Sequence, residues 1–133
     1  ALILKEQDFR DSMKSHDWTQ YQDKVLCVFC STDAIIPSWG FMLVATMAAP
    51  YAKEVFFGTP DQWISRQLLA YIDQLDLAPY ADQRVIIKGC SDHVTIGPEI
   101  YVALTSRLVP VVKSLMFGET CSTVPVYKRP KGA

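Results

Sequence analysis

Three cysteines are the residues of this chain whose type and position could do chemistry: Cys30, Cys90 and Cys121. Cys30 and Cys90 are related by an internal duplication, because residues 24–61 align with residues 84–121 without a gap and share eight identities. A duplication means that one supersecondary unit is used twice, so a group at one cysteine should have a counterpart at the other. The repeat therefore predicts that these cysteines belong to one site.

Two further side chains that can bind metals follow these cysteines at the same spacing. Asp33 lies three residues after Cys30, and His93 lies three residues after Cys90. Thiolate, imidazole and carboxylate groups are typical ligands of zinc, and thiolates hold iron–sulfur clusters. We therefore predict a zinc or iron–sulfur site whose ligands are Cys30, Cys90, Cys121, Asp33 and His93.

Two other functions are compatible with the same cysteines. The helices expected after Cys30 and Cys90 begin close to each thiol, and the partial positive charge of a helix N-terminus lowers the pKa of a thiol. Either cysteine could then act as the nucleophile of a thiol-dependent enzyme or transferase. Cysteine is also a small hydrophobic residue, and all three could simply be packed inside an interaction module. The sequence alone therefore leaves open whether the protein is an enzyme.

Short apolar runs and segments of helical length follow one another along the chain. The runs do not alternate between apolar and polar residues, which is typical of parallel strands covered on both faces. Cys27 falls inside the first run and points to the opposite face from Cys30, so we expect it in the core. The expected strands are residues 25–29, 55–57, 85–87 and 115–117, and the expected helices are residues 6–14, 38–49, 61–75 and 98–109.

This α-β-α-β order, used twice, predicts an α/β fold. Right-handed crossovers place the two first strands together, which yields a three-layer, four-stranded parallel sheet with strand order 2-1-3-4. The expected organisation is a single domain over residues 1–133, with repeat 1 over about 5–61, repeat 2 over about 62–121 and a tail over 122–133. Cys30 and Cys90 would end the central strands, where ligands bind in such sheets.

Composition and charge narrow the class of protein. Half of the 133 residues are apolar and the net charge is −1, so nothing indicates a nucleic-acid partner. Residues 34–52 lack charged side chains, but Pro37, Gly40 and Pro50 interrupt them, and we expect a buried helix rather than a membrane span. Cysteines at the ends of parallel strands argue against structural disulfides, and we predict a cytoplasmic protein without a membrane partner.

The helix expected at residues 38–49 predicts self-association. Its apolar side chains lie all around the helix, whereas a helix on a sheet normally keeps a polar side toward water. The equivalent helix of the second repeat carries Glu99 and Arg107. Because a twofold dimer is the common way to cover such a surface, we predict a homodimer through this helix, with Trp39 or Met42 at the contact.

Four segments of the chain form a recognisable pattern: residues 4–10 (LKEQDFR), 33–37 (DAIIP), 85–91 (VIIKGCS) and 116–125 (MFGETCSTVP). They resemble an uncharacterised bacterial family known as domain of unknown function 2480, and the resemblance extends over essentially the whole chain. It implies no known activity. It does imply a link to iron–sulfur cluster assembly, with assembly proteins as partners. The family motif includes Cys30, Asp33, Cys90 and Cys121, but His93 is not part of it.

Overall fold

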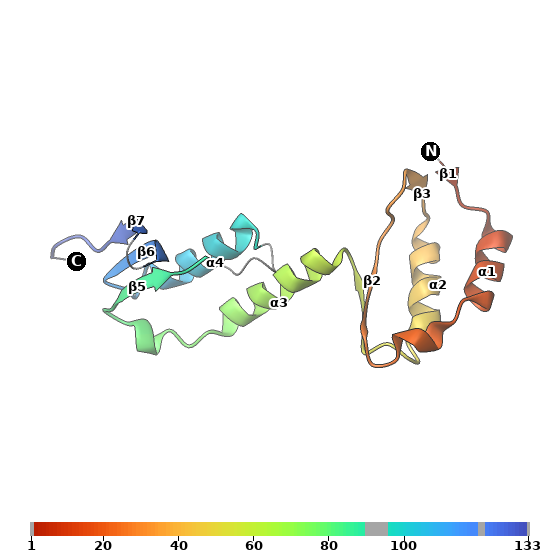
Figure 1. The fold of residues 1–133 in the computed structure, drawn as a ribbon, viewed down its shortest axis with the longest axis horizontal. Coiled ribbons are helices and arrows are strands. Elements are labelled where there is room, and N and C mark those ends of the chain that lie inside the picture. Colours follow the sequence, from red (N-terminus) through yellow and green to blue (C-terminus); the bar gives the residue numbers. More distant parts are fainter. Residues whose placement is uncertain (1, 90–95, 120–121, 133) are drawn as a thin grey trace. The chain divides into compact units, whose positions relative to one another are not determined.

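The computed structural model describes residues 2–89, 96–119 and 122–132, in which helices alternate with short strands (Figure 1). The helices are α1 (Glu6–Ser15), α2 (Ser38–Ala48), α3 (Pro60–Gln74) and α4 (Pro98–Leu108), with the short 3₁₀ helices η1 (Trp18–Tyr21) and η2 (Ala78–Tyr80). The strands are β1 (Leu2–Ile3), β2 (Val25–Val28), β3 (Ala34–Ile35), β4 (Glu54–Phe57), β5 (Arg84–Ile87), β6 (Ser114–Glu119) and β7 (Ser122–Lys128). The chain divides into two compact units, Ala1–Trp63 (unit 1) and Ile64–Ala133 (unit 2).

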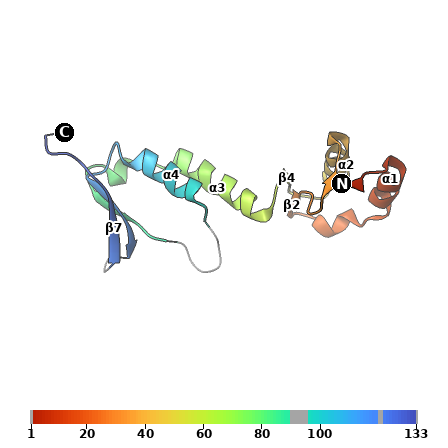
Figure 2. The ribbon, with the colours of Figure 1, turned by 90° about the horizontal axis from the view of Figure 1, so that it is seen from above.

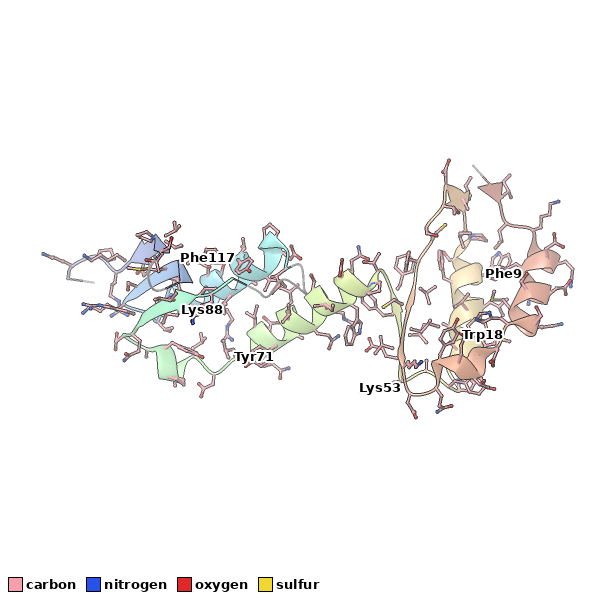
Figure 3. All side chains as sticks on the ribbon, in the orientation of Figure 1. Phe9, Trp18, Lys53, Tyr71, Lys88 and Phe117 are labelled. Atoms are coloured by element: carbon pink, nitrogen blue, oxygen red, sulfur yellow. The ribbon has the colours of Figure 1, made fainter. Side chains whose placement is uncertain are left out.

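Unit 1 contains a two-stranded parallel sheet, β2–β4, with α2 in the crossover between the strands. The register pairs Val28 with Phe57 at the end of the sheet. α1 packs against α2, where the rings of Phe9 and Trp39 meet edge-on with centroids 5.8 Å apart. A very short second parallel pair, β1–β3, joins the start of the chain to the segment that leads into α2. The segment that precedes β2 is anchored by the buried ring of Trp18 (Figure 3).

Unit 2 contains a three-stranded sheet in the order β5-β6-β7, with β5 and β6 parallel and β7 antiparallel to β6. Its core is the buried cluster of Leu108, Val112 and Leu115. Arg107 on α4 donates hydrogen bonds to the main-chain oxygens of Ile72 (2.6 Å) and Leu75 (2.9 Å), at the C-terminal end of α3. Arg107 was expected on the solvent-facing side of this helix. Its side chain instead holds α4 against the end of α3.

The two units repeat the same capping contact before their first strand. The carboxylate of Asp17 accepts a hydrogen bond from the main-chain N–H of Thr19 at 3.0 Å. In unit 2, the carboxylate of Asp76 accepts one from the N–H of Ala78, also at 3.0 Å. Corresponding residues in this part of the two units are therefore 59 positions apart.

An aromatic pair between helix and strand is repeated as well, but at a different spacing. Phe41 on α2 and Phe57 on β4 meet edge-on with centroids 5.1 Å apart, and Tyr101 on α4 and Phe117 on β6 do so at 5.4 Å. These residues are 60 positions apart. The connection between the first strand and its following helix is therefore one residue longer in unit 2.

This extra residue changes the alignment of the first strands. Val28 pairs with Phe57 in unit 1, and Ile87 pairs with Phe117 in unit 2, so Ile87 is the counterpart of Val28. The gap-free alignment of the sequence pairs Val28 with Lys88 instead and is shifted by one residue within this strand. The shift arises because a run of similar apolar residues matches nearly as well in either register.

The predicted three-layer, four-stranded parallel sheet with strand order 2-1-3-4 is wrong. β2 pairs with β4, and β5 pairs with β6, but these pairs belong to separate sheets, and the second sheet is mixed because β7 is antiparallel. Apolar runs predict where strands form but not which strand lies beside which, since pairing depends on residues far apart in the sequence. The prediction of a single domain over residues 1–133 stays a prediction.

β7 occupies part of the segment expected to be a C-terminal tail. Tyr127 pairs with the buried Leu115 and is half-buried, whereas Val124, Pro125 and Val126 are exposed, and a register shift between Leu115 and Met116 interrupts the alternation of the strand. The apolar run rule misses such a strand because its side chains form no continuous buried run.

The four predicted helices are all present, and no end differs by more than one residue from its expected position. In the described parts of the chain, no helix is both long and apolar enough to cross a bilayer.

Candidate functional site

Cys30 lies two residues after the end of β2, and its side chain is exposed. Its Sγ donates a hydrogen bond to the main-chain oxygen of Thr32 at 3.2 Å and lies 3.8 Å from the Thr32 hydroxyl. Hydrogen bonds with the backbone and side chain of Thr32 lower the pKa of the Cys30 thiol, although desolvation and the charge of Asp33 act in the opposite direction. A lowered pKa favours the thiolate, which is the reactive form of cysteine.

An open pocket of about 270 Å³ lies beside Cys30 in unit 1. β2 contributes Val28 to its walls, and α2 contributes Gly40 and Phe41. Gly40 permits a close approach of the chain to α2, because a Cβ at this position would lie only 3.2 Å from Cγ2 of Ile36. Since the walls are mainly apolar, the Cys30 thiol is the reactive group that this pocket offers.

Unit 2 has a pocket of about 290 Å³. Its walls include Ile87 and Tyr101, which are the counterparts of Val28 and Phe41. The two pockets thus share one position of the first strand and one of the following helix, but the unit 2 pocket is also lined by residues of β6 and β7 (Leu115, Met116, Phe117 and Val126).

Two of the predicted ligands, Cys90 and Cys121, follow the carboxyl ends of β5 and β6 in the sequence. Gly89 directly precedes Cys90, and a Cβ on Gly89 would lie 3.6 Å from Cζ of Phe117 on β6. β6 ends at Glu119, two residues before Cys121. Because β5 and β6 are parallel, the described residues that lead to both cysteines lie at the same edge of the sheet.

The described residues include two of the predicted metal ligands, Cys30 and Asp33, and both are exposed. Cys90, His93 and Cys121 lie outside the described residues, so the predicted metal site stays a prediction. Within residues 2–89, 96–119 and 122–132, no group of three or more His, Cys, Asp or Glu side chains could hold a metal ion. Any site built on the predicted set therefore depends on Cys90, His93 or Cys121.

Thr32 is a contributor to the site that the sequence analysis missed. A hydroxyl two residues after a cysteine in a loop is the signal that could have identified it. Cys27, by contrast, is only half-buried, opposite Phe56 in the register of β2 and β4. It is therefore less enclosed than the core position predicted for it.

The chain belongs to the family described as Protein of unknown function (DUF2480), whose model matches residues 1–129. This match confirms the resemblance found in the sequence. No curated protein and no solved structure matches the chain.

Proposed function

We propose that this protein binds zinc or an iron–sulfur cluster through Cys90, Cys121 and His93. The observation that carries this proposal is that β5 and β6 end at one sheet edge, where Gly89 lies beside Phe117. Zinc–thiolate bonds of about 2.3 Å require ligand sulfurs roughly 4 Å apart, which segments leading from one sheet edge can supply. In this role the protein would act in the cytoplasm, accessory to iron–sulfur cluster assembly and with assembly proteins as partners.

Metal analysis of protein purified without oxygen tests this proposal. Elemental analysis and the visible absorption spectrum should show bound zinc or an iron–sulfur chromophore in the wild type, and Cys90→Ser and Cys121→Ser should abolish it. Cys27→Ser is the matched control, because this thiol lies within β2 and should not affect the metal content. Absence of metal from the wild type, or its retention in both ligand variants, would contradict the proposal.

The same measurement decides whether unit 1 contributes ligands. The sequence predicts Cys30 and Asp33 as members of the set, whereas the proposal above names only residues of unit 2. If the Cys30→Ser or Asp33→Asn variant loses its metal, the substituted residue belongs to the site. If both variants retain the metal, the site is restricted to unit 2.

A second function, a thiol-dependent reaction at Cys30, is favoured by one specific observation. The thiol is exposed, has a lowered pKa and lines a pocket of about 270 Å³. We expect the metal-free protein to be alkylated faster at Cys30 than at Cys27 near pH 7, since the thiolate is the attacking species. Thr32→Val should slow alkylation at Cys30, because it removes the hydroxyl that helps to lower the pKa. Equal rates at both cysteines would exclude an activated nucleophile.

We also propose that the protein forms a homodimer through α2. Met42 on α2 is 68% exposed. Trp39, in contrast, packs on Phe9, and the guanidinium carbon of Arg10 lies 5.8 Å from the centre of its ring. Because Trp39 already has cover within unit 1, Met42 is the contact residue that we propose.

Sedimentation at micromolar concentration tests the dimer. The wild type should sediment as a dimer and Met42→Lys as a monomer, because the lysine would be buried without a partner. Val102→Lys is the matched control, since Val102 is the counterpart of Met42 on α4 and is 65% exposed. A monomeric wild type, or dissociation caused by Val102→Lys alone, would exclude this interface.

A further inference from the structure

The three-stranded sheet of unit 2 has one face that no helix covers among the described residues. Leu115 on β6 is buried in the core cluster, so its neighbours Ser114 and Met116 point to the opposite face. Figure 2 shows α3 and α4 together on one side of these strands. The chemistry of this uncovered face is therefore set by the alternate side chains of each strand, those that point away from the core.

A row of basic side chains crosses this face at the beginning of β5 and β6. Arg84, Ser114 and Lys128 are direct partners in the register of β5, β6 and β7, so they lie side by side on the same face. Lys113 precedes Ser114, and Arg84, Lys113 and Lys128 are all exposed. Ser114 separates Arg84 from Lys128, so no two of these charges are direct partners in the sheet, and the row concentrates positive charge that an anion can compensate.

Arg129 gives this basic row a fixed end. One nitrogen of its guanidinium donates to Oδ1 of Asp82 at 2.6 Å. The other donates to the main-chain oxygens of Val111 (3.0 Å) and Val112 (3.1 Å). Because these contacts hold Arg129 in place, the neighbouring Lys128 at the end of β7 is held close to the row.

An apolar row follows the basic row on the same face. Ile86, Met116 and Pro125 are register partners on the next positions of the three strands. Of these, Met116 and Pro125 adjoin the basic residues in an open groove of about 590 Å³, together with the exposed side chain of Val126. None of the described residues that line this groove is acidic.

The distribution of charge in the chain supports an anionic ligand here. Residues 64–133 contain eight Lys and Arg and six Asp and Glu, whereas residues 1–63 contain five and eight. Basic residues therefore outnumber acidic ones in unit 2, although the net charge of the whole chain is −1. The groove volume of about 590 Å³ lies in the range of small-molecule sites.

We propose that this face of unit 2 binds a small amphipathic anion. Its phosphate or carboxylate group contacts Arg84, Lys113 and Lys128, and its apolar part covers Met116 and Pro125. Basic side chains recognise such head groups by charge-assisted hydrogen bonds, and the apolar row contributes by burial. This ligand is independent of the metal and of the Cys30 thiol.

Isothermal titration calorimetry of the full chain with decyl phosphate, kept below its critical micelle concentration, tests this proposal. Decyl phosphate should bind, and inorganic phosphate should bind at least about tenfold more weakly because it lacks the apolar part. The double substitution Arg84→Gln with Lys128→Gln should weaken decyl phosphate binding by at least about tenfold. Met116→Gln should weaken decyl phosphate binding but not that of inorganic phosphate.

Two controls separate loss of the site from loss of the fold. Lys53→Gln removes the counterpart of Lys113 in unit 1 and should leave binding unchanged. The charge-conserving pair Arg84→Lys with Lys128→Arg should retain binding, because both positions keep the positive charge that contacts the anion.

Four results would overturn the proposal. The first is that the protein does not bind decyl phosphate, and the second is that the glutamine double variant binds it as tightly as the wild type. The third is equal affinity for inorganic and decyl phosphate, and the fourth is that the protein binds a membrane or a nucleic acid more tightly than decyl phosphate. For the last, vesicles of phosphatidylglycerol and a single-stranded oligonucleotide serve as probes. Preference for either would assign the basic row to a membrane or a nucleic acid. A second copy of the chain on this face would be revealed if the glutamine variant changed the sedimentation coefficient without affecting ligand binding.

Discussion

Units 1 and 2 repeat the same α-β-α-β order and the same aromatic contact, yet their cores differ. Among the described residues, two apolar side chains are buried in unit 1 and five in unit 2. Those of unit 1 are Trp18 and Ala48, and those of unit 2 are Ile72, Ile100, Leu108, Val112 and Leu115. The counterpart positions Phe57 and Phe117 are 68% and 38% exposed.

The third strand accounts for much of this difference. β7 pairs along the outer edge of β6, whereas β4 pairs only with β2 among the described residues. A two-stranded sheet is at best marginally stable alone, and a unit of about 60 residues has little core to compensate. Cover of unit 1 from outside its own residues is the role that we propose for the α2 dimer.

The largest expected effect comes from a matched pair of leucine substitutions. Leu115→Ala should lower the free energy of unfolding by about 3–4 kcal/mol, because it leaves a cavity in the buried cluster of unit 2. Leu26→Ala on the half-buried strand β2 should cost only about 1–2 kcal/mol. Chemical denaturation followed by circular dichroism measures both. Equal losses would mean that unit 1 is as well packed in solution as unit 2.

A smaller effect is expected from the contact that fixes the end of β7. Arg129→Gln removes the hydrogen bonds to Asp82, Val111 and Val112 and should destabilise the protein by about 2 kcal/mol. The exposed neighbour Lys128 is the control, and Lys128→Gln should change the stability by less than about 0.5 kcal/mol. If both variants unfold at the same denaturant concentration as the wild type, β7 does not depend on this contact.

The smallest effect concerns the repeated cap before the first strand. Hydrogen bonds from the side chain and backbone of Thr19 lower the pKa of Asp17 below 3.8. A lowered pKa means that the carboxylate stabilises the fold above the pKa of the unfolded chain, and that this contribution is lost as the pH falls through the folded value. The stability difference between wild type and Asp17→Ala should therefore be constant near neutral pH and shrink below about pH 4.

Asp76→Ala removes the same N–H acceptor in unit 2 and is the matched variant. Thermal unfolding between pH 3 and pH 7 measures both. A difference for Asp17→Ala that persists unchanged at pH 3 would show that the carboxylate charge is not what stabilises this turn.

The position of Cys30 at the end of a strand could be anticipated because its evidence is local. Cys30 was identified from its position after an apolar run and from the duplicated motif, and the structure places it just after β2 with an exposed thiol. The contribution of Thr32 and the basic row, in which Ser114 lies between Arg84 and Lys128, were not anticipated. The row in particular joins residues from three strands, which no spacing within one segment reveals.

The sequence by itself determined where the helices and the first four major strands form, because periodicity and apolar runs act over a few neighbouring residues. It also determined the family, since the matching segments extend over nearly the whole chain. Only the tertiary structure decided that β2–β4 and β5–β6 lie in separate sheets, and that β7 completes one of them. The physical reason is that an apolar run specifies that a strand must be covered, whereas the covering element is chosen by contacts between distant residues.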